Sequence, residues 1–278
     1  MNRRKFIRNI GILTAACGLY SWRVEPYWLD IKHVTMPVQN LPAKLAGKKL
    51  MQISDIHVGN GFDSNFLVQS FKKAEKYEPD FVVYTGDFVT WRNDEQLQQL
   101  QDVLKHCVKG KFATLGILGN HDYGKGWKEN NVADKVSAVA ENSGITMLRN
   151  SRKEINGLVF TGFEDFWSNR FNYYLMKDHD KAVANIVLCH NPDACDHNIW
   201  NNYQGWILAG HTHGGQVKIP FVDAPVVPVN NKRYTSGKID LDDGRILYIN
   251  RGLSTSHYVR FSVRPEITIF KLQNNKYR

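Results

Sequence analysis

The segment "ILAGHTHGGQVKIP", residues 207–220, joins an apolar run to a cluster of polar and flexible residues. His211 and His213 are separated by one threonine, so in an extended chain their side chains point to the same side. The glycines around them allow a tight turn or the close approach of a ligand to the backbone. The segment therefore predicts a strand whose end holds a ligand.

Four other apolar runs also end in polar residues, which makes five such runs in the chain. Helix-like stretches separate the first three of the five. The runs cover residues 48–54, 81–86, 111–119, 185–189 and 205–210. Amphipathic stretches near 64–77, 94–108 and 130–142 carry apolar residues at helical spacing. Strands that alternate with helices favour an α/β domain with largely parallel central strands.

The C-terminal third of the chain has a different pattern. Asp243-Gly244 lies between two alternating runs and predicts a hairpin, and residues 266–272 form a further run with a period of two. We expect residues 153–164 and 234–272 to build a second sheet that stacks on the first. The predicted fold class is α/β, with two stacked mixed β-sheets flanked by helices in a four-layer α-β-β-α sandwich.

Potential metal ligands follow the carboxyl end of all five runs, which is where open α/β sheets bind ligands. They are Asp55, His57, Asp87, Asn120, His121, Asp122, His190, His211 and His213. Buried polar groups need partners, so side chains gathered in this way point to a common ligand. Imidazole, carboxylate and amide groups suit Mn, Fe, Co or Zn, and Asp87, which follows Gly86, is the natural bridge between two ions.

The net charge of +9 belongs mainly to the N-terminus. Residues 1–50 hold nine Lys or Arg against Glu25 and Asp30, a net of +7, and the remaining 228 residues hold 27 basic and 25 acidic side chains, a net of +2. A nearly neutral body lacks the broad basic surface that nucleic acids require. We therefore expect no nucleic-acid partner, and a nuclease is disfavoured.

The N-terminus resembles an export signal. Arg3-Arg4-Lys5-Phe6-Ile7-Arg8 is similar to the twin-arginine motif, and an uncharged run from Asn9 to Trp22 follows it. Residues 1–30 are thus expected to be a signal or membrane anchor, 31–46 a connector or edge strand, and 47–278 the folded domain. Positive charge at the start favours a periplasmic or extracytoplasmic body, and the alternative is an ordinary basic first helix.

The four cysteines, at positions 17, 107, 189 and 195, form no CxxC pair. Three of them fall in the body of the chain and cannot all pair within it. We expect buried thiols.

Taken in order, the motifs resemble those of the calcineurin-like metallophosphoesterase superfamily over about residues 48–272. They read Asp55-x-His57, Gly86-Asp87, Gly119-Asn120-His121-Asp122, His190 and Gly210-His211-x-His213. The form "GHTHGGQ" together with the twin-arginine start is similar to the bacterial branch of exported or membrane-attached phosphodiesterases. That branch is similar in turn to enzymes that hydrolyse UDP-2,3-diacylglucosamine in lipid A synthesis.

The resemblance implies two divalent metal ions, Mn, Zn or Fe. One would be held by Asp55, His57, Asp87 and His213, and the other by Asp87, Asn120, His190 and His211. His121 would be the catalytic histidine close to the leaving-group oxygen, and Asp122 would orient it. The activity implied is hydrolysis of a phosphodiester or pyrophosphate bond by a hydroxide that bridges the metals.

Aromatic and basic residues near the strand ends are candidates for substrate contacts. Arg92 and Arg170 could clamp phosphate. A hydrophobic or sugar-nucleotide leaving group could rest on the residues of the wider set, which are Trp91, Arg92, Tyr123, Trp127, Phe166, Trp167, Arg170 and Arg251. The substrate is expected to be an anionic, phosphate-containing small molecule or lipid of the cell envelope. Two alternatives stay open: a lipid A pathway hydrolase on the inner membrane facing the cytoplasm, and a non-catalytic envelope protein that binds metal.

Overall fold

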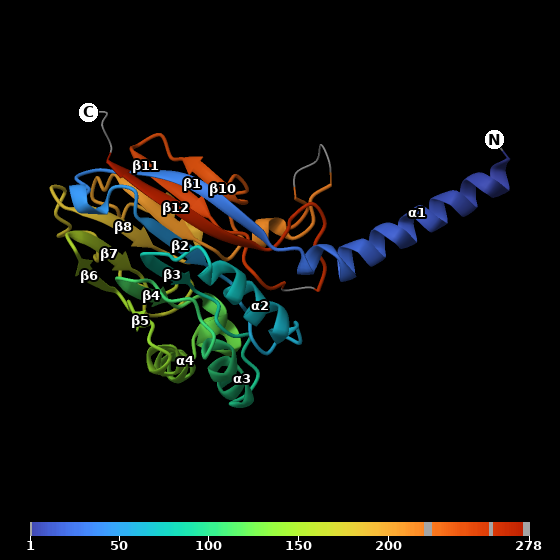
Figure 1. The fold of residues 1–278 in the computed structure, drawn as a ribbon, viewed down its shortest axis with the longest axis horizontal. Coiled ribbons are helices and arrows are strands. Elements are labelled where there is room, and N and C mark those ends of the chain that lie inside the picture. The colour runs from blue at the N-terminus through green and yellow to red at the C-terminus, as the bar shows by residue number, and fades with distance from the viewer. Residues whose placement is uncertain (1, 220–223, 256–257, 275–278) are drawn as a thin grey trace.

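Two six-stranded mixed sheets stack on each other in the computed structural model, which describes residues 2–219, 224–255 and 258–274 (Figure 1). The strand order is β1-β12-β2-β3-β4-β5 in the first sheet and β10-β11-β9-β8-β7-β6 in the second. Helices α2, α3 and α4 lie together beside the first sheet. The predicted sandwich of two mixed sheets with flanking helices is confirmed.

The elements have the following bounds. The first sheet contains β1 (Asp30–Val38), β2 (Lys49–Ile53), β3 (Phe81–Thr85), β4 (Ala113–Ile117), β5 (Thr146–Met147) and β12 (Glu266–Asn274). The second contains β6 (Ser151–Ile155), β7 (Leu158–Gly162), β8 (Ala184–Leu188), β9 (Gly205–Ala209), β10 (Gly237–Asp240) and β11 (Arg245–Ile249). The α-helices are α1 (Arg3–Arg23), α2 (Ser64–Glu75), α3 (Glu95–Leu104) and α4 (Asn130–Asn142). Short 3-10 helices are η1 (Glu25–Tyr27), η2 (Ala43–Leu45), η3 (Asn120–Tyr123), η4 (Lys125–Trp127), η5 (Pro192–Asp196) and η6 (His213–Gly215).

The division of strands between the sheets differs from the expectation. The hairpin β6–β7 starts the second sheet, and β8 and β9 extend it by parallel pairing, so the last two predicted runs do not join the first three. In the other direction, β12 inserts between β1 and β2 of the first sheet, antiparallel to β2. Its apolar residues alternate between the two faces, and both faces are covered. The hairpin predicted at Asp243-Gly244 joins β10 to β11.

The core has three layers, and alternation along the strands produces them. On β3, Phe81 and Val83 point into the space between the sheets, whereas Val82 and Tyr84 pack against the helices. The outer face of the second sheet is covered by loops between residues 163 and 204, with Trp200 and Tyr203 among their buried side chains and the short η5 in place of a long helix. All four cysteines, each in a described part of the chain, are free, and 107, 189 and 195 are buried.

The first helix projects from the body, and only its C-terminal end is attached to it (Figure 1). The carbonyl of Ser21 accepts a hydrogen bond from the Arg260 amide, and the buried carboxylate of Glu25 accepts one from the Val263 amide. The Tyr27 ring then stacks on Phe62 at 5.2 Å. Of the helices in the described residues, none combines the length and the apolar composition needed to cross a bilayer.

The segment predicted as a connector or edge strand contains an edge strand. Residues 30–38 form β1, an edge strand that pairs in parallel with β12 along its whole length, and η2 follows it. Parallel pairing with a central strand buries Met36 and Val38 between the sheets. The folded body therefore begins at about Glu25, upstream of the predicted domain start at residue 47.

The attachment of α1 predicts a difference between two truncations. Deleting residues 2–19 removes exposed helix and should change the free energy of unfolding by less than about 0.5 kcal/mol. Deleting residues 2–28 leaves the buried Val263 amide without its acceptor and removes the Tyr27 ring, and should cost about 2–4 kcal/mol. Urea denaturation of both variants measures the difference. Equal stabilities would contradict the docking of Glu25 and Tyr27 on the body.

Candidate metal centre

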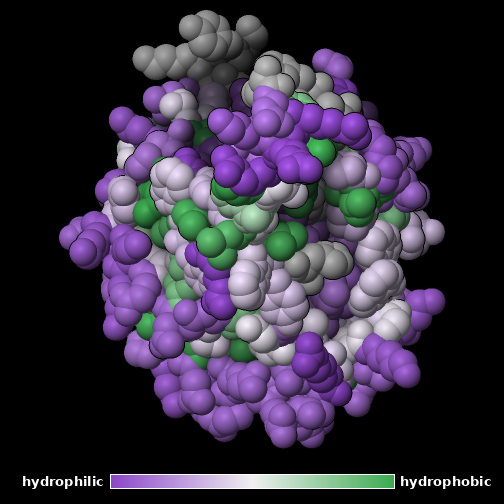
Figure 2. Space-filling model, turned by 90° about the vertical axis from the view of Figure 1, so that its right-hand side faces the viewer, coloured by the Kyte–Doolittle hydropathy of each residue, from purple (hydrophilic) through white to green (hydrophobic). Residues whose placement is uncertain are grey.

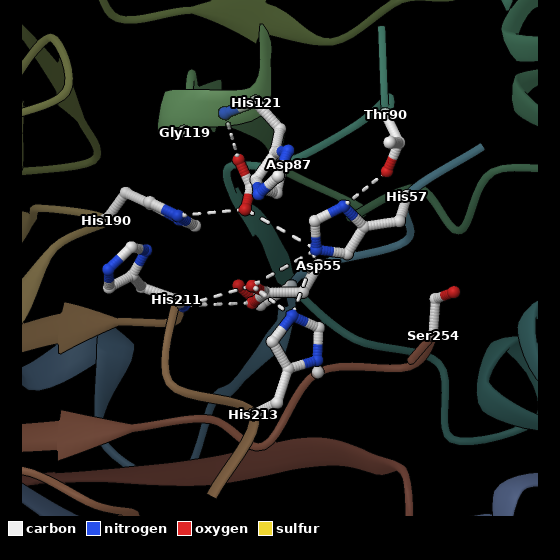
Figure 3. A network of polar contacts seen from close by, with 12 residues as sticks. Asp55, His57, Asp87, Thr90, Gly119, His121, His190, His211, His213 and Ser254 are labelled. Carbon is white, nitrogen blue, oxygen red and sulfur yellow. Dashed lines mark hydrogen bonds and ion pairs between the residues drawn. The ribbon is translucent and has the colours of Figure 1, made fainter. Parts of the chain in front are cut away.

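The predicted ligands converge at one end of the sandwich, where strand ends from both sheets meet (Figure 3). Asp55 and His57 follow β2, Asp87 follows β3 and Asn120 follows β4; His190 follows β8, and His211 and His213 follow β9. Among the described residues, three overlapping groups have ligand atoms within 4.8 Å of one another. They are Asp55–His57–His213, His57–Asp87–His121 and Asp87–His190–His211.

Asp87 lies at the centre of the cluster. One of its carboxylate oxygens, Oδ2, is 3.4 Å from His57 Nε2 and 3.2 Å from His190 Nε2. Its other oxygen, Oδ1, accepts a hydrogen bond of 2.9 Å from the His121 amide. Asp55 lies on one side, 3.3 Å from His213 Nε2. A carboxylate in this place can contact ligands that come from both sheets.

An unusual backbone brings these side chains together. Of the seven predicted ligands, all of them in described residues, five have left-handed φ angles: Asp55 (52°), His57 (43°), Asp87 (56°), His211 (72°) and His213 (50°). Such angles are uncommon outside glycine and tend to collect at functional sites. Glycine is also required at position 86. Its φ angle is +95°, and a Cβ there would lie 2.6 Å from both the Gly119 amide nitrogen and His190 Nδ1.

The hydrogen bonds of His190 leave a lone pair that faces a carboxylate. Its Nδ1 donates to the Thr85 carbonyl at 2.7 Å, so in a neutral ring Nε2 carries the lone pair. Burial acts to lower the pKa of His190, but the Asp87 carboxylate outweighs burial and raises this pKa well above its ordinary value, so a proton occupies Nε2 when no metal ion does. That buried Nε2 has no hydrogen-bond partner and lies 3.2 Å from Asp87. Two acceptors at this distance repel each other unless a proton or a metal ion binds them, and the outer hydrogen bond is the kind that orients a ligating imidazole.

His211 presents the same situation on the neighbouring strand. Its Nε2 donates to the Pro228 carbonyl at 2.9 Å, which leaves the lone pair on Nδ1. In the amide orientation of this structure, that lone pair lies 2.9 Å from the oxygen of Asn120, a second acceptor. A shared cation resolves this contact as well. The residues around Asp87 therefore fit a metal ion.

A third contact of this type joins His57 to His213. Their Nε2 atoms are 3.0 Å apart, and Nδ1 of His57 pairs with the Thr90 hydroxyl at 3.0 Å. Each Nε2 also lies within 3.4 Å of a carboxylate, Asp87 for His57 and Asp55 for His213. Two imidazoles and two carboxylates arranged around one point are a suitable ligand set for a divalent ion.

Burial sets the protonation of these groups. It lowers the pKa of His57 and of His211 to about 3 and that of His213 well below the ordinary value, so these imidazoles stay neutral and able to bind metal. Burial also raises the pKa of Asp55 to about 7. For Asp87, burial is outweighed by His190, His121 and His57, and its pKa is held well below the usual range.

His121 and Asp122 occupy different places in the cluster. The His121 ring is partly exposed and lies edge-on to His57, with centroids 4.9 Å apart. Asp122 is buried, and its oxygens accept hydrogen bonds from the amides of Val89 at 3.0 Å and Gly119 at 2.9 Å. These bonds attach Asp122 to the turn that also carries His121; a role of Asp122 in orienting His121 stays a prediction.

The contacts that the structure shows for the two arginines predicted to hold phosphate are with residues other than the predicted metal ligands. Arg170 forms an ion pair of 2.9 Å with Asp134, which Arg149 also contacts. Arg92 is exposed, and its amide donates to the Gln96 side chain at 2.9 Å. Phosphate binding by these side chains stays a prediction.

Two residues of the site did not stand out in the sequence. Thr90, which positions His57, follows β3 by five residues without any pattern that marks it. Asp165 is fully buried, and its Oδ2 has no hydrogen-bond partner. Burial raises its pKa to about 6, and the charges of His190 and Asp87 also act on it, which connects it to the cluster. It follows the end of β7, so the rule that found the other strand-end ligands could have found it once residues 158–162 were recognised as a strand of this edge.

The chain is similar to known proteins over most of its length. Residues 48–215 match the family described as calcineurin-like phosphoesterase. The uncharacterized metallophosphoesterase YkuE of Bacillus subtilis is 30% identical over 293 residues, covering 99% of this chain and 98% of the relative. Phosphodiesterase YaeI of Escherichia coli is 27% identical over 284 residues, covering 98% and 99%. The UDP-2,3-diacylglucosamine pyrophosphatase LpxG of Chlamydia trachomatis is 27% identical over 320 residues, covering 94% of each.

The cluster predicts that metal stabilises the fold. Treatment of the purified protein with EDTA should lower the melting temperature, and Mn²⁺ should restore it, because an ion bound only by the native state adds to its stability. The Asp87→Ala variant should show little response to either reagent, because it lacks the central carboxylate. Calorimetry and elemental analysis provide the measurements. A control is Asp102→Ala, which removes an exposed carboxylate on α3. If neither EDTA nor Mn²⁺ changes the melting temperature of the wild type, the prediction that this cluster binds metal is contradicted.

Proposed function

The chain belongs to the calcineurin-like phosphoesterase family and is a metal-dependent phosphoester hydrolase, and we propose that it cleaves a phosphodiester or pyrophosphate bond with two divalent metal ions. The observation that carries this proposal is the central position of Asp87, which contacts imidazoles from both sheets. A shared carboxylate of this kind suits a pair of ions.

The seven strand-end ligands divide into two sets. Asp55, His57 and His213 would hold one ion, Asn120, His190 and His211 the other, and Asp87 both. Bound Mn, Zn or Fe would neutralise phosphoryl oxygens and bring the pKa of a bound water towards neutrality. Because Asn120 is neutral and two carboxylates only partly balance two dications, the site keeps a positive charge that attracts an anionic substrate.

His121 would supply a proton to the leaving-group oxygen. It is the member of the cluster with a partly exposed ring, so it can reach a substrate while its backbone amide stays bonded to Asp87. Imidazole exchanges protons in the neutral range and is a common general acid. Asp122 would keep the turn in place through the Val89 and Gly119 amides.

The proposed substrate is a lipid or another compound of the cell envelope. The names of two relatives support a diester or a pyrophosphate: phosphodiesterase YaeI and the LpxG pyrophosphatase, which is named for UDP-2,3-diacylglucosamine. A lipid A pathway reaction is the alternative within the same chemistry, and it would require the body to face the cytoplasm.

We further propose that the N-terminus exports or anchors the protein. Basic residues begin α1, and apolar side chains are exposed along the helix and at its base, including Ile12, Leu13, Trp22 and Trp28. Figure 2 shows the end of the molecule from which α1 projects, with hydrophobic residues gathered near the centre of this face and hydrophilic residues around them. Such a surface suits contact with an anionic membrane.

Removal of His121 should separate metal binding from turnover. The His121→Ala variant is expected to keep its metal and to lose about 10²- to 10⁴-fold in kcat on an aryl phosphodiester, because proton transfer contributes this much. Elemental analysis and steady-state kinetics with added Mn²⁺ measure the two properties. His106→Ala, which changes an exposed histidine two residues after the end of α3, serves as the matched control.

The same assay tests the proposed activity. The full chain with Mn²⁺ is compared on an aryl phosphodiester, an aryl phosphomonoester and UDP-2,3-diacylglucosamine, and the diester or the pyrophosphate should be preferred. Wild-type turnover by His121→Ala would disprove the role of that residue. A metal-loaded wild type inert towards all three compounds would favour the non-catalytic metal-binding alternative.

A fusion experiment tests the location. Residues 1–35 joined to a reporter that is active only outside the cytoplasm should give signal, and replacing both Arg3 and Arg4 by lysine should abolish it, because twin-arginine export reads the arginine pair. Arg8→Lys is the control. An inactive reporter found in the membrane fraction would place the body on the cytoplasmic side instead.

A further inference from the structure

Two tryptophans form a stacked pair beside the metal ligands. The rings of Trp127, the last residue of η4, and Trp167, in the loop after β7, are stacked with centroids 4.7 Å apart. Trp167 meets His211 edge-on at 4.6 Å, and Trp127 meets His121 edge-on at 6.4 Å. The pair thus connects a predicted metal ligand with the residue placed at the leaving group.

The two loops are fastened to each other below the rings. The buried Tyr123 hydroxyl donates to the buried carboxylate of Glu164, and Arg149 donates to the same carboxylate at 2.8 Å. The Trp167 amide in turn donates to Asp165 at 2.8 Å. Buried charge-assisted bonds of this kind hold a binding surface in one arrangement before a ligand arrives.

Trp127 has features that packing alone does not account for. Its φ angle is +62°, in the left-handed region. In the sequence it follows Gly126 and precedes Lys128. Backbone strain in a bulky residue next to a reactive group is characteristic of ligand contacts. In addition, 39% of the residue remains accessible to solvent, so an indole face is available beside His121.

We propose that Trp127, supported by Trp167, forms a wall that binds the leaving group of the substrate through a ring. This inference rests on the proposed function, in which the leaving-group oxygen lies at His121. An indole face stacks on aromatic rings and on the apolar face of sugars, and it gives a flexible acyl chain no comparable geometric advantage. The leaving side of the substrate is therefore a nucleoside, aryl or sugar unit, whatever the other side carries.

The test is a binding comparison that needs no turnover. Mn²⁺-loaded full-length protein is titrated calorimetrically with benzylphosphonate and with n-hexylphosphonate, which have the same charged group and similar apolar area but differ in the ring. Wild type should bind the benzyl compound about three- to tenfold tighter, as expected for a ring stacking on indole. Trp127→Leu should reduce this ratio to less than twofold while the metal content stays the same.

Two further variants control for a merely structural effect. Trp127→Phe keeps a ring and should retain most of the preference, and Trp28→Leu, which changes an exposed tryptophan at the base of α1, should retain all of it. Equal affinities in the wild type, tighter binding of the hexyl compound, or an unchanged ratio in Trp127→Leu would each overturn the ring site.

The outcome is separable from that of the proposed function. If the wild type prefers benzylphosphonate but hydrolyses no phosphodiester, the ring site is supported and the proposed enzymatic activity is contradicted. A wild type that hydrolyses diesters without any benzyl preference would do the reverse. Competition experiments then distinguish the kinds of ring. Displacement of benzylphosphonate by adenosine 5′-monophosphate would support a nucleoside unit, and displacement by glucose 1-phosphate would support a sugar unit. In either case Trp127→Leu should weaken binding of the competitor.

Discussion

Lone pairs that face each other in a buried space are the constraint on which this structure depends. One ring nitrogen of His190 and one of His211 donates to a backbone carbonyl. The other nitrogen faces an acceptor, which is a carboxylate oxygen of Asp87 for His190 and the Asn120 oxygen for His211. Burial makes an extra proton costly on His57, His211 and His213, whereas Asp87 favours a proton on His190 until a metal ion replaces it. A divalent ion removes the repulsion at several contacts together, so the arrangement of the strand ends has its explanation in metal binding.

The backbone carries a cost for the same arrangement. The left-handed residues of the cluster each require on the order of 1 kcal/mol, and together this is a large share of the 5–15 kcal/mol by which domains are stable. Local hydrogen bonds recover part of it. The amide of Asp55 donates to the Gly86 carbonyl and that of His57 to the Asp87 carbonyl, both at 3.0 Å. The rest is expected from the ions, which couples metal affinity to folding.

Strand-end ligands and amphipathic helices could be predicted because their signals are local. His211 and His213 follow the apolar run that forms β9, and α2, α3 and α4 follow apolar spacing. The extended conformation predicted for His211-x-His213 is wrong, because both residues have left-handed φ angles and His213 begins η6. The position of β12 could not be predicted, since a run such as residues 266–272 pairs equally well with an edge or a central partner. Thr90 and the Trp127–Trp167 stack depend on loops whose conformation is set by distant residues such as Glu164. Pairwise contacts of this type leave no periodic trace.

The N-terminal helix and the metal centre share one scaffold. Arg260 is fully buried; its amide holds the end of α1 at Ser21, and its guanidinium donates to the carbonyls of Arg251, Gly252 and Ser254. That loop is packed against the first ligand, because a side chain at Gly252 would collide with Asp55, whose carbonyl accepts the Ser254 amide at 3.0 Å. The direction of α1 is therefore fixed relative to the ligands. A surface that bound the helix, as proposed above for a membrane, would therefore also determine what the open end of the site faces.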